Sequence, residues 1–147
     1  MKRTLIHNAT IVNEGRSVQG SVVIEGDRIA EILTYGKKLS VPCDETIDAT
    51  GCCLLPGIID DHVHFRDPGL THKADIFTES RAAAAGGVTS IMDMPNTNPL
   101  TTTLSALEQK FDLLNEKCIV NHSCYFGATN NNYTEFNQLD KHRVCAV

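Results

Sequence analysis

The sequence contains no tryptophan, and aromatic residues make up only 5% of its 147 residues. It also lacks any run of about 20 apolar residues, the length that a helix needs to cross a bilayer. Neither sign of charge dominates, since 13 Lys and Arg are set against 18 Asp and Glu for a net charge of −5. We therefore expect neither nucleic acid nor a membrane as a partner, because no basic patch or apolar span is present.

The cysteines form no C-x-x-C pair, so the spacing that is typical of zinc knuckles and redox motifs is missing. The first eight residues begin basic but lack a long apolar segment and a cleavage site, so no secretion signal is expected. Free thiols in a reducing cytoplasm are the interpretation that fits both observations. The six cysteines are Cys43, Cys52, Cys53, Cys118, Cys124 and Cys145.

The first third of the chain has the pattern of a small β domain. Over the whole sequence, hydrophobic residues make up 41% and charged residues 21%, as in ordinary globular proteins. Short β-branched runs alternate with turn signals such as Asn13-Glu14-Gly15 and Glu25-Gly26-Asp27. No helix-length periodicity interrupts them. We predict a small β-sandwich segment over residues 1–55.

The character of the chain changes at Pro56-Gly57, and residues 56–147 alternate between strand and helix patterns. An alternation of this kind predicts a parallel sheet with crossover helices, either doubly wound or part of a (β/α)8 barrel. Polar residues cluster after strand ends and no Gly-rich phosphate loop follows the first strand, so we favour about the first four strands of a TIM-type barrel. The expected helices cover residues 74–85, 102–117 and 134–141, between apolar strands that begin at 58, 88, 123 and 144.

His62 and His64 stand two residues apart at the end of the first of these strands. Residues i and i+2 of a strand share one face, so both imidazoles can reach one cation. Asp60 is expected on the same face. An H-x-H pair alone is more often two ordinary surface or core histidines, but here Arg66 and a Pro-Gly turn follow at once, where barrel active sites lie.

The segment Pro56-Gly57-Ile58-Ile59-Asp60-Asp61-His62-Val63-His64-Phe65-Arg66-Asp67-Pro68-Gly69 resembles the first-strand motif of the amidohydrolase superfamily in its dihydroorotase form. Asp93-Met94-Pro95-Asn96-Thr97-Asn98-Pro99 is similar to the second-strand motif of that family. The resemblance implies that His62 and His64 are metal ligands, normally for one or two Zn²⁺ ions. It also implies that Arg66 and Asn96 bind the substrate carboxylate, and that Asp60 has a supporting role.

The activity that this resemblance implies is the interconversion of carbamoyl-L-aspartate and L-dihydroorotate in pyrimidine biosynthesis. A metal ion would lower the pKa of water from about 15.7 toward about 7 for hydrolytic ring opening. The implied partners are the small-molecule substrate and either a second copy of the chain or aspartate transcarbamoylase.

The family completes its site with a bridging lysine or aspartate, further histidines and a catalytic aspartate, and we expect these beyond residue 147. The 147 residues alone are therefore predicted to be inactive. Two alternatives stay open: an allantoinase or hydantoinase, which would differ in substrate, and a non-catalytic scaffold related to dihydroorotase.

Several other residues have plainer interpretations. His72 follows the histidine motif and either lines the pocket or belongs to the start of the next helix. Asp93 is expected to make a structural hydrogen bond, and Cys124 and Cys145 are expected to be core thiols.

Overall fold

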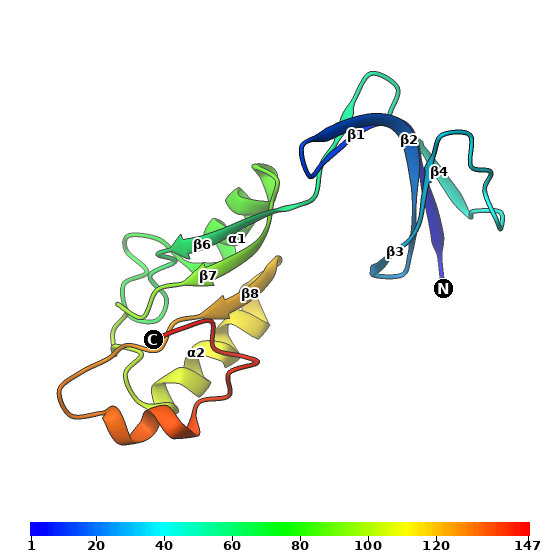
Figure 1. Cartoon of the computed structure of the whole chain (residues 1–147). Helices are drawn as coiled ribbons and strands as arrows, with labels where there is room; N and C mark the ends of the chain where they lie inside the picture. Colours follow the sequence, from blue (N-terminus) through cyan, green and yellow to red (C-terminus); the bar gives the residue numbers. More distant parts are fainter. The chain divides into compact units, whose positions relative to one another are not determined.

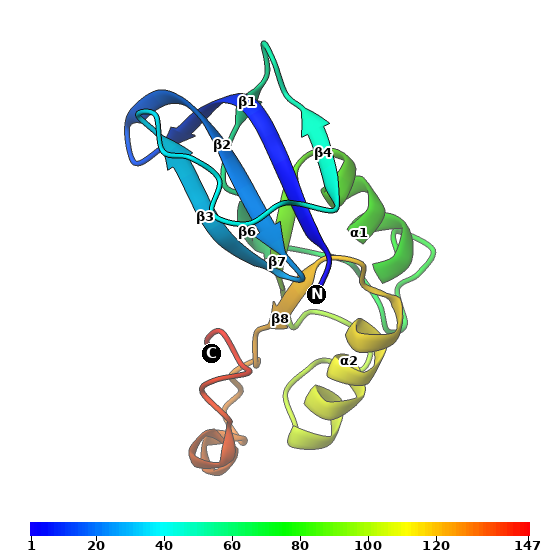
Figure 2. The same cartoon turned by 90° about the vertical axis from the view of Figure 1, so that its right-hand side faces the viewer.

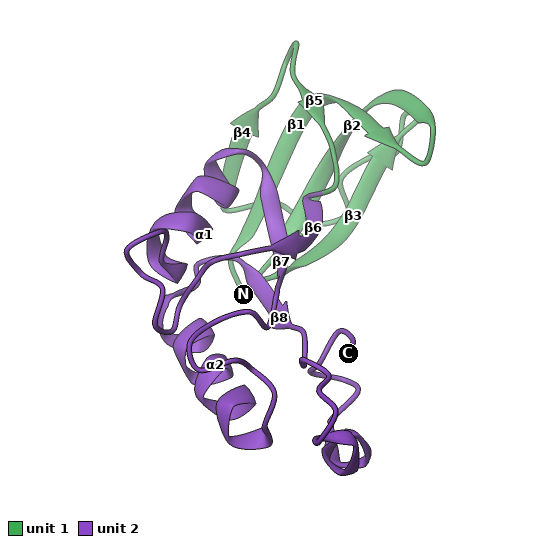
Figure 3. Ribbon diagram, turned by 90° about the vertical axis from the view of Figure 1, so that its left-hand side faces the viewer, with its two compact units in different colours: residues 1–56 green, residues 57–147 purple.

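A computed structural model describes residues 1–147, and they form two compact units. Unit 1 comprises Met1–Pro56 and unit 2 comprises Gly57–Val147 (Figure 3). No helix in either unit combines the length and the apolar character that a membrane span requires.

Unit 1 is a single five-stranded sheet, and the predicted sandwich is corrected accordingly. Its order is β3-β2-β1-β4 (Figure 2), and β5 also pairs with β1. The first three strands are antiparallel neighbours, whereas β4 and β5 run parallel to β1. The two late strands are short and extend the free edge of β1, so they build no second layer. The bounds are β1 Arg3–Asn13, β2 Arg16–Glu25, β3 Arg28–Thr34, β4 Glu45–Asp48 and β5 Cys53–Leu54.

The turns of unit 1 lie where the sequence predicts them. Glu14 and Gly15 both have positive φ, 49° and 71°, between the ends of β1 and β2. Two consecutive positive φ values match a two-residue hairpin turn whose twist suits antiparallel strands. This turn fixes the long β1–β2 pairing.

Unit 2 contains a parallel three-stranded sheet in the order β6-β7-β8, with crossover helices between its strands (Figure 1). The predicted alternation of strand and helix is confirmed. The predicted fourth strand is reduced to one parallel bridge between Cys124 and Val144. The bounds are β6 Ile58–Val63, α1 Ile76–Ala85, β7 Val88–Asp93, α2 Leu104–Lys117, β8 Asn121–Cys124 and the 3₁₀ helix η1 Tyr133–Gln138.

Both α-helices begin at a side-chain cap. Asp75 accepts a hydrogen bond from the backbone N–H of Thr78 at 2.9 Å, and Thr103 accepts one from Ala106 at 3.2 Å. The cap of α2 is therefore Thr103, one residue after the predicted start of this helix at 102. Thr103 has the extended backbone that a cap requires, with φ −129° and ψ 154°.

The core of unit 2 lies between the sheet and its helices. Leu107, Phe111 and Leu114 come from the apolar face of α2 and pack with Ile91 of β7 and Cys124 of β8. This packing covers one face of the sheet and places the carboxyl ends of β6, β7 and β8 at one edge.

Candidate metal and carboxylate site

The end of β6 is irregular, and this irregularity arranges the polar residues. Asp60 is paired with Ile91 and Val63 with Asp93, so β6 has one residue more than β7 between these pairs. The extra residue is a β-bulge, which interrupts strict alternation. Asp60 is thus out of step with His62 and His64, and the predicted shared face of all three is wrong. Its carboxylate instead accepts the backbone N–H of His62 at 3.2 Å.

His62 and His64 do come together. Their ring centroids are 5.1 Å apart and the rings meet edge to face at 67°. Two imidazoles that bind one zinc ion at about 2.0–2.1 Å place their ring centres roughly 5 Å apart. The pair therefore has the spacing that a shared cation requires.

Asn96, in the loop after β7, sets the tautomer of His64. The amide oxygen of Asn96 lies 2.8 Å from His64 Nδ1, and an amide oxygen only accepts, so Nδ1 carries the proton. The His64 Nε2 lone pair is then free for a cation, as in metal sites where the second ring nitrogen is held by a partner. Asn96 retains its amide N–H groups to donate elsewhere.

Arg66 adopts an unusual backbone conformation beside this pair. Its φ is +65°, in the left-handed region that residues other than glycine rarely occupy. Its guanidinium forms none of the ion pairs found in the chain. A half-buried arginine without an acidic partner next to two histidines is suited to an anionic ligand.

The loops that follow β6 and β7 are in direct contact. Asn98 donates its backbone N–H to the Pro68 carbonyl at 3.0 Å. Gly69 has φ +80°, and a Cβ built there would lie 2.0 Å from the Asn98 carbonyl oxygen. Only glycine permits this approach, which holds the loop of Arg66 against the loop of Asn96.

A buried ionic network underlies both loops, and sequence analysis missed its central member, Lys110. Lys110 and Asp93 are fully buried and form an ion pair rather than a well-directed hydrogen bond. The lysine lies on the apolar stripe of α2 with Leu107 and Leu114. A lysine on such a stripe is the signal that could have revealed it, since a buried ammonium needs a partner.

Tyr125 is a second residue that the patterns did not single out. It follows β8, and its hydroxyl donates to the carbonyl oxygen of Asp61 at 2.9 Å. Desolvation raises the pKa of this phenol, so it stays protonated as a donor at neutral pH. Its hydrogen bond thus joins the end of β8 to the bulged end of β6, the two outer strands of the sheet.

The remaining histidines lie away from the pair. His7 contacts Ser21 in unit 1, and His122 contacts Asn115 of α2. His72 is exposed, and the cap of α1 is Asp75, so His72 caps nothing. Burial raises the pKa of Cys124 to about 12, in line with a core thiol.

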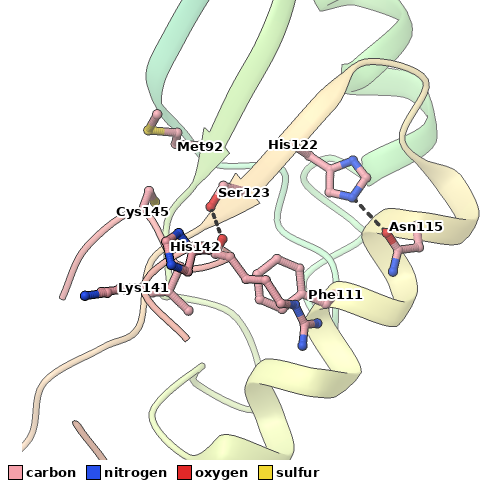
Figure 4. Close-up of a pocket in the computed structure, with 10 residues that line it drawn as sticks. Met92, Phe111, Asn115, His122, Ser123, Lys141, His142 and Cys145 are labelled. Carbon is pink, nitrogen blue, oxygen red and sulfur yellow. Dashed lines mark hydrogen bonds between the residues drawn. The ribbon is translucent and has the colours of Figure 1, made fainter. Parts of the chain in front are cut away.

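A cavity of about 530 Å³ lies elsewhere than at the histidine pair. It lies beside β8, between Ser123, Asn115 of α2 and the last residues of the chain, including Lys141, His142 and Cys145 (Figure 4). Neither His62 nor His64 lines it. The histidine pair at the end of β6 therefore lies at an open edge of the sheet and not in this cavity.

The donor set fits part of a zinc site. Two neutral imidazoles are good zinc ligands, but catalytic zinc takes three protein ligands. No third His, Cys, Asp or Glu gathers with the pair. His62 and His64 can supply two of the three protein ligands. A complete site would need a further ligand from another residue.

A model of the dihydroorotase-like family matches residues 51–142, which include both motifs and every residue of the site described above. The chain belongs to the dihydroorotase-like family. It is similar to the dihydroorotase of Lactobacillus acidophilus, with 39% identity over 133 residues that cover 90% of this chain and 30% of the relative. It is also similar to that of Methanosarcina mazei, with 42% identity over 127 residues, 86% of this chain and 27% of the relative.

The chain is also similar to solved structures of a hydantoinase and a dihydropyrimidinase. An L-hydantoinase (dihydropyrimidinase) from Arthrobacter aurescens matches with a TM-score of 0.90 and 28% identity over 99% of this chain and 32% of that one. A dihydropyrimidinase from Brevibacillus agri matches with a TM-score of 0.79 and 30% identity over 95% of this chain and 30% of that one. The chain thus spans about three tenths of the length of the relatives it matches.

Proposed function

We propose that this chain carries the first metal ligands and the carboxylate-binding side chains of a zinc-dependent cyclic amide hydrolase of the dihydroorotase type. The proposed reaction interconverts L-dihydroorotate and carbamoyl-L-aspartate, a step of pyrimidine formation. The observation that supports it best is Arg66, a guanidinium without an acidic partner, two residues from His64 and on a loop that contacts the loop of Asn96.

His62 and His64 would hold the zinc ion. When bound, zinc lowers the pKa of water toward about 7 and polarises a carbonyl group. The chain's own contribution is orientation, because the Nδ1–H of His64 donates to Asn96 and leaves Nε2 for the metal.

Arg66 and Asn96 would bind the substrate. A guanidinium meets a carboxylate through two parallel N–H bonds, and an amide N–H can add a third donor. Dihydroorotate carries a carboxylate on its ring, whereas a simple hydantoin does not. An arginine in this position therefore favours the dihydroorotase reaction over the hydantoinase reaction.

The full site needs more residues than these. The further metal ligands and the general acid/base, an aspartate, are proposed to lie in the part of the relatives that this chain does not span. The 147-residue chain alone is accordingly expected to show no turnover of dihydroorotate. Association with a second copy or with aspartate transcarbamoylase stays a prediction.

A hybrid enzyme tests the proposal. The matching first segment of the Lactobacillus acidophilus dihydroorotase is replaced by this chain, and the ring opening of dihydroorotate and of hydantoin is measured. We expect turnover of dihydroorotate. Arg66→Met should lower its kcat/KM by roughly 10- to 100-fold, the effect of losing charge-assisted hydrogen bonds. Arg81→Met is the matched control, because Arg81 is exposed on α1 and contacts only the ring of Phe77.

A hydantoinase is the second candidate, favoured by the TM-score of 0.90 with the Arthrobacter aurescens enzyme. It predicts that the hybrid opens hydantoin with Arg66→Met unaffected. A hybrid that is folded and opens hydantoin but not dihydroorotate would reject the dihydroorotase proposal.

A further inference from the structure

The backbone on both sides of Arg66 is held by one buried ion pair. Asp93, the last residue of β7, accepts the backbone N–H of Phe65 at 2.9 Å through Oδ1. Lys110, its ionic partner, donates to the carbonyl oxygen of Asp67 at 3.0 Å. Phe65 and Asp67 are the two chain neighbours of Arg66. The pair thus grips the backbone immediately before and after that residue.

The conformation between these two contacts is strained. Arg66 has φ +65°, which a residue with a Cβ leaves unless its surroundings hold it there. The bond to the N–H of Phe65 and the bond to the carbonyl of Asp67 fix the chain on both sides of Arg66 and so restrict its φ angle. The strained residue, Arg66, therefore lies between the two hydrogen bonds that the ion pair makes to the backbone.

A second lysine of the same helix strengthens the outer contact. Lys117 lies seven residues, about two helical turns, after Lys110, so both project from the same side of α2. Its ammonium binds the Asp67 carboxylate at 2.8 Å, and the Asp67 residue is buried. One helix thus holds both the carbonyl and the side chain of the residue after Arg66.

Fold stability alone does not account for a fully buried charge pair. Apolar side chains of similar volume often serve a core equally well or better, because two charges must be stripped of water. Here the pair also forms hydrogen bonds with two backbone groups that have no partner in a strand ladder. These are the N–H before Arg66 and the carbonyl after it. These two groups belong to the chain between His64 and the Pro68 turn.

We infer that Lys110 and Asp93 are positioning residues that clamp Arg66 in its left-handed conformation and set His64 beside Asn96. Neither residue touches metal or substrate. The clamp links Lys110 of α2 to the candidate site, so loss of its ammonium group alters both ligand spacing and arginine orientation. This inference rests on the proposed function for its purpose, but the conformation that it describes can be measured without it.

The test compares variants of the 147-residue chain in which the exposed Cys52 and Cys53 are serine, so that thiolates do not compete for zinc. Lys110→Met removes the ammonium and keeps an unbranched side chain of similar length. Asp93→Asn/Lys110→Met is a second variant without a net buried charge, in case the single variant does not fold. Leu114→Ala is the matched control, because Leu114 is fully buried in the same helix and belongs to the apolar core, not to the ion pair.

Two readouts are taken on folded samples. The intraresidue HN–Hα NOE of Arg66 reports its positive φ, and a zinc titration reports the histidine pair. We expect Lys110→Met to lose the strong NOE and to bind zinc about tenfold more weakly, the usual effect of removing a residue that orients a ligand. The double variant should lose the NOE as well, since the bond to the Asp67 carbonyl is gone. Leu114→Ala should keep both properties despite its lower stability.

Two results would overturn the inference: an Arg66 NOE that persists in Lys110→Met and in the double variant, or one that Leu114→Ala loses to the same extent. The zinc readout separates this failure from a failure of the proposed function. If the parent chain and its His62→Ala variant bind zinc equally, the proposed zinc site is rejected, and the Arg66 NOE alone then decides for or against the clamp.

Discussion

Unit 1 and unit 2 are stabilised in different ways. Unit 1 buries only small or β-branched side chains on one sheet, namely Ala9, Val22, Val23 and Ala49 together with Ser21. Unit 2 buries three large rings and several aliphatic side chains, and adds a buried ion pair beneath two loops. Every candidate ligand lies in unit 2. Its deeper core encloses a fully buried ion pair, whereas unit 1 supplies strand pairing without a comparable interior.

The largest expected effect is on the core of unit 2. Leu114→Ala should lower the free energy of unfolding by about 2–5 kcal/mol, because it leaves a cavity in a fully buried position. Val23→Ala in unit 1 deletes fewer carbon atoms and should cost less. Amide hydrogen exchange, read separately on β1–β2 and on β6–β8, checks both. If the two variants lose the same free energy of unfolding, the contrast between the units is contradicted.

The next effect concerns two glycines with similar backbone angles, Gly69 in unit 2 and Gly15 in unit 1. Gly69→Ala should cost roughly 1–3 kcal/mol from strain, with a further loss because its Cβ would lie 2.0 Å from the Asn98 carbonyl oxygen. Gly15→Ala meets nothing within 4 Å and should show the strain alone. Denaturant unfolding of both variants measures the difference. If Gly15→Ala is the more damaging variant, the loop contact at the site is not as tight as described.

The smallest effect is at alkaline pH. The hydrogen bond with Asp67 raises the pKa of Lys117 above 10.5. A raised pKa in the folded state gives stability that is complete below about pH 10.5 and is lost as the pH passes through the folded pKa. The stability difference between the parent and Lys117→Met should shrink in that range. Solvent screens the pair, since the Lys117 side chain is 35% exposed, so the change should be small.

Lys2 of unit 1 provides the control for that measurement. Its pKa is also raised, by the hydrogen bond with Glu45, but their side chains are 67% and 47% exposed. Lys2→Met should therefore shift the alkaline stability less than Lys117→Met does. A larger shift for Lys2→Met would show that burial of Asp67 adds nothing.

Much of this structure could be predicted from local patterns. The β character of unit 1, the helices of unit 2 and the parallel order of its strands follow from periodicity and turn residues. The pairing of His62 with His64 follows from their spacing in a strand. Arg66 and Asn96 could be assigned only through a resemblance, because nothing in their local sequence gives them a role.

Other features depend on contacts between distant segments. The bulge in β6 arises from its register with β7, so strict alternation misplaced Asp60. The single sheet of unit 1 arises because β4 and β5 pair with β1 across more than 30 residues. Lys110 forms its buried ion pair with Asp93, 17 positions earlier in the chain, and local patterns do not show this contact.

The central claim is that the end of β6 is a metal site, and zinc titration of the chain with Cys52 and Cys53 changed to serine tests it most directly. The parent should bind one zinc ion weakly, since it offers two of the protein ligands that a catalytic site uses. His62→Ala and His64→Ala should each weaken zinc binding by about tenfold or more. His122→Ala, the control, should leave zinc binding unchanged. Equal zinc binding by the parent and by both site variants would contradict the account.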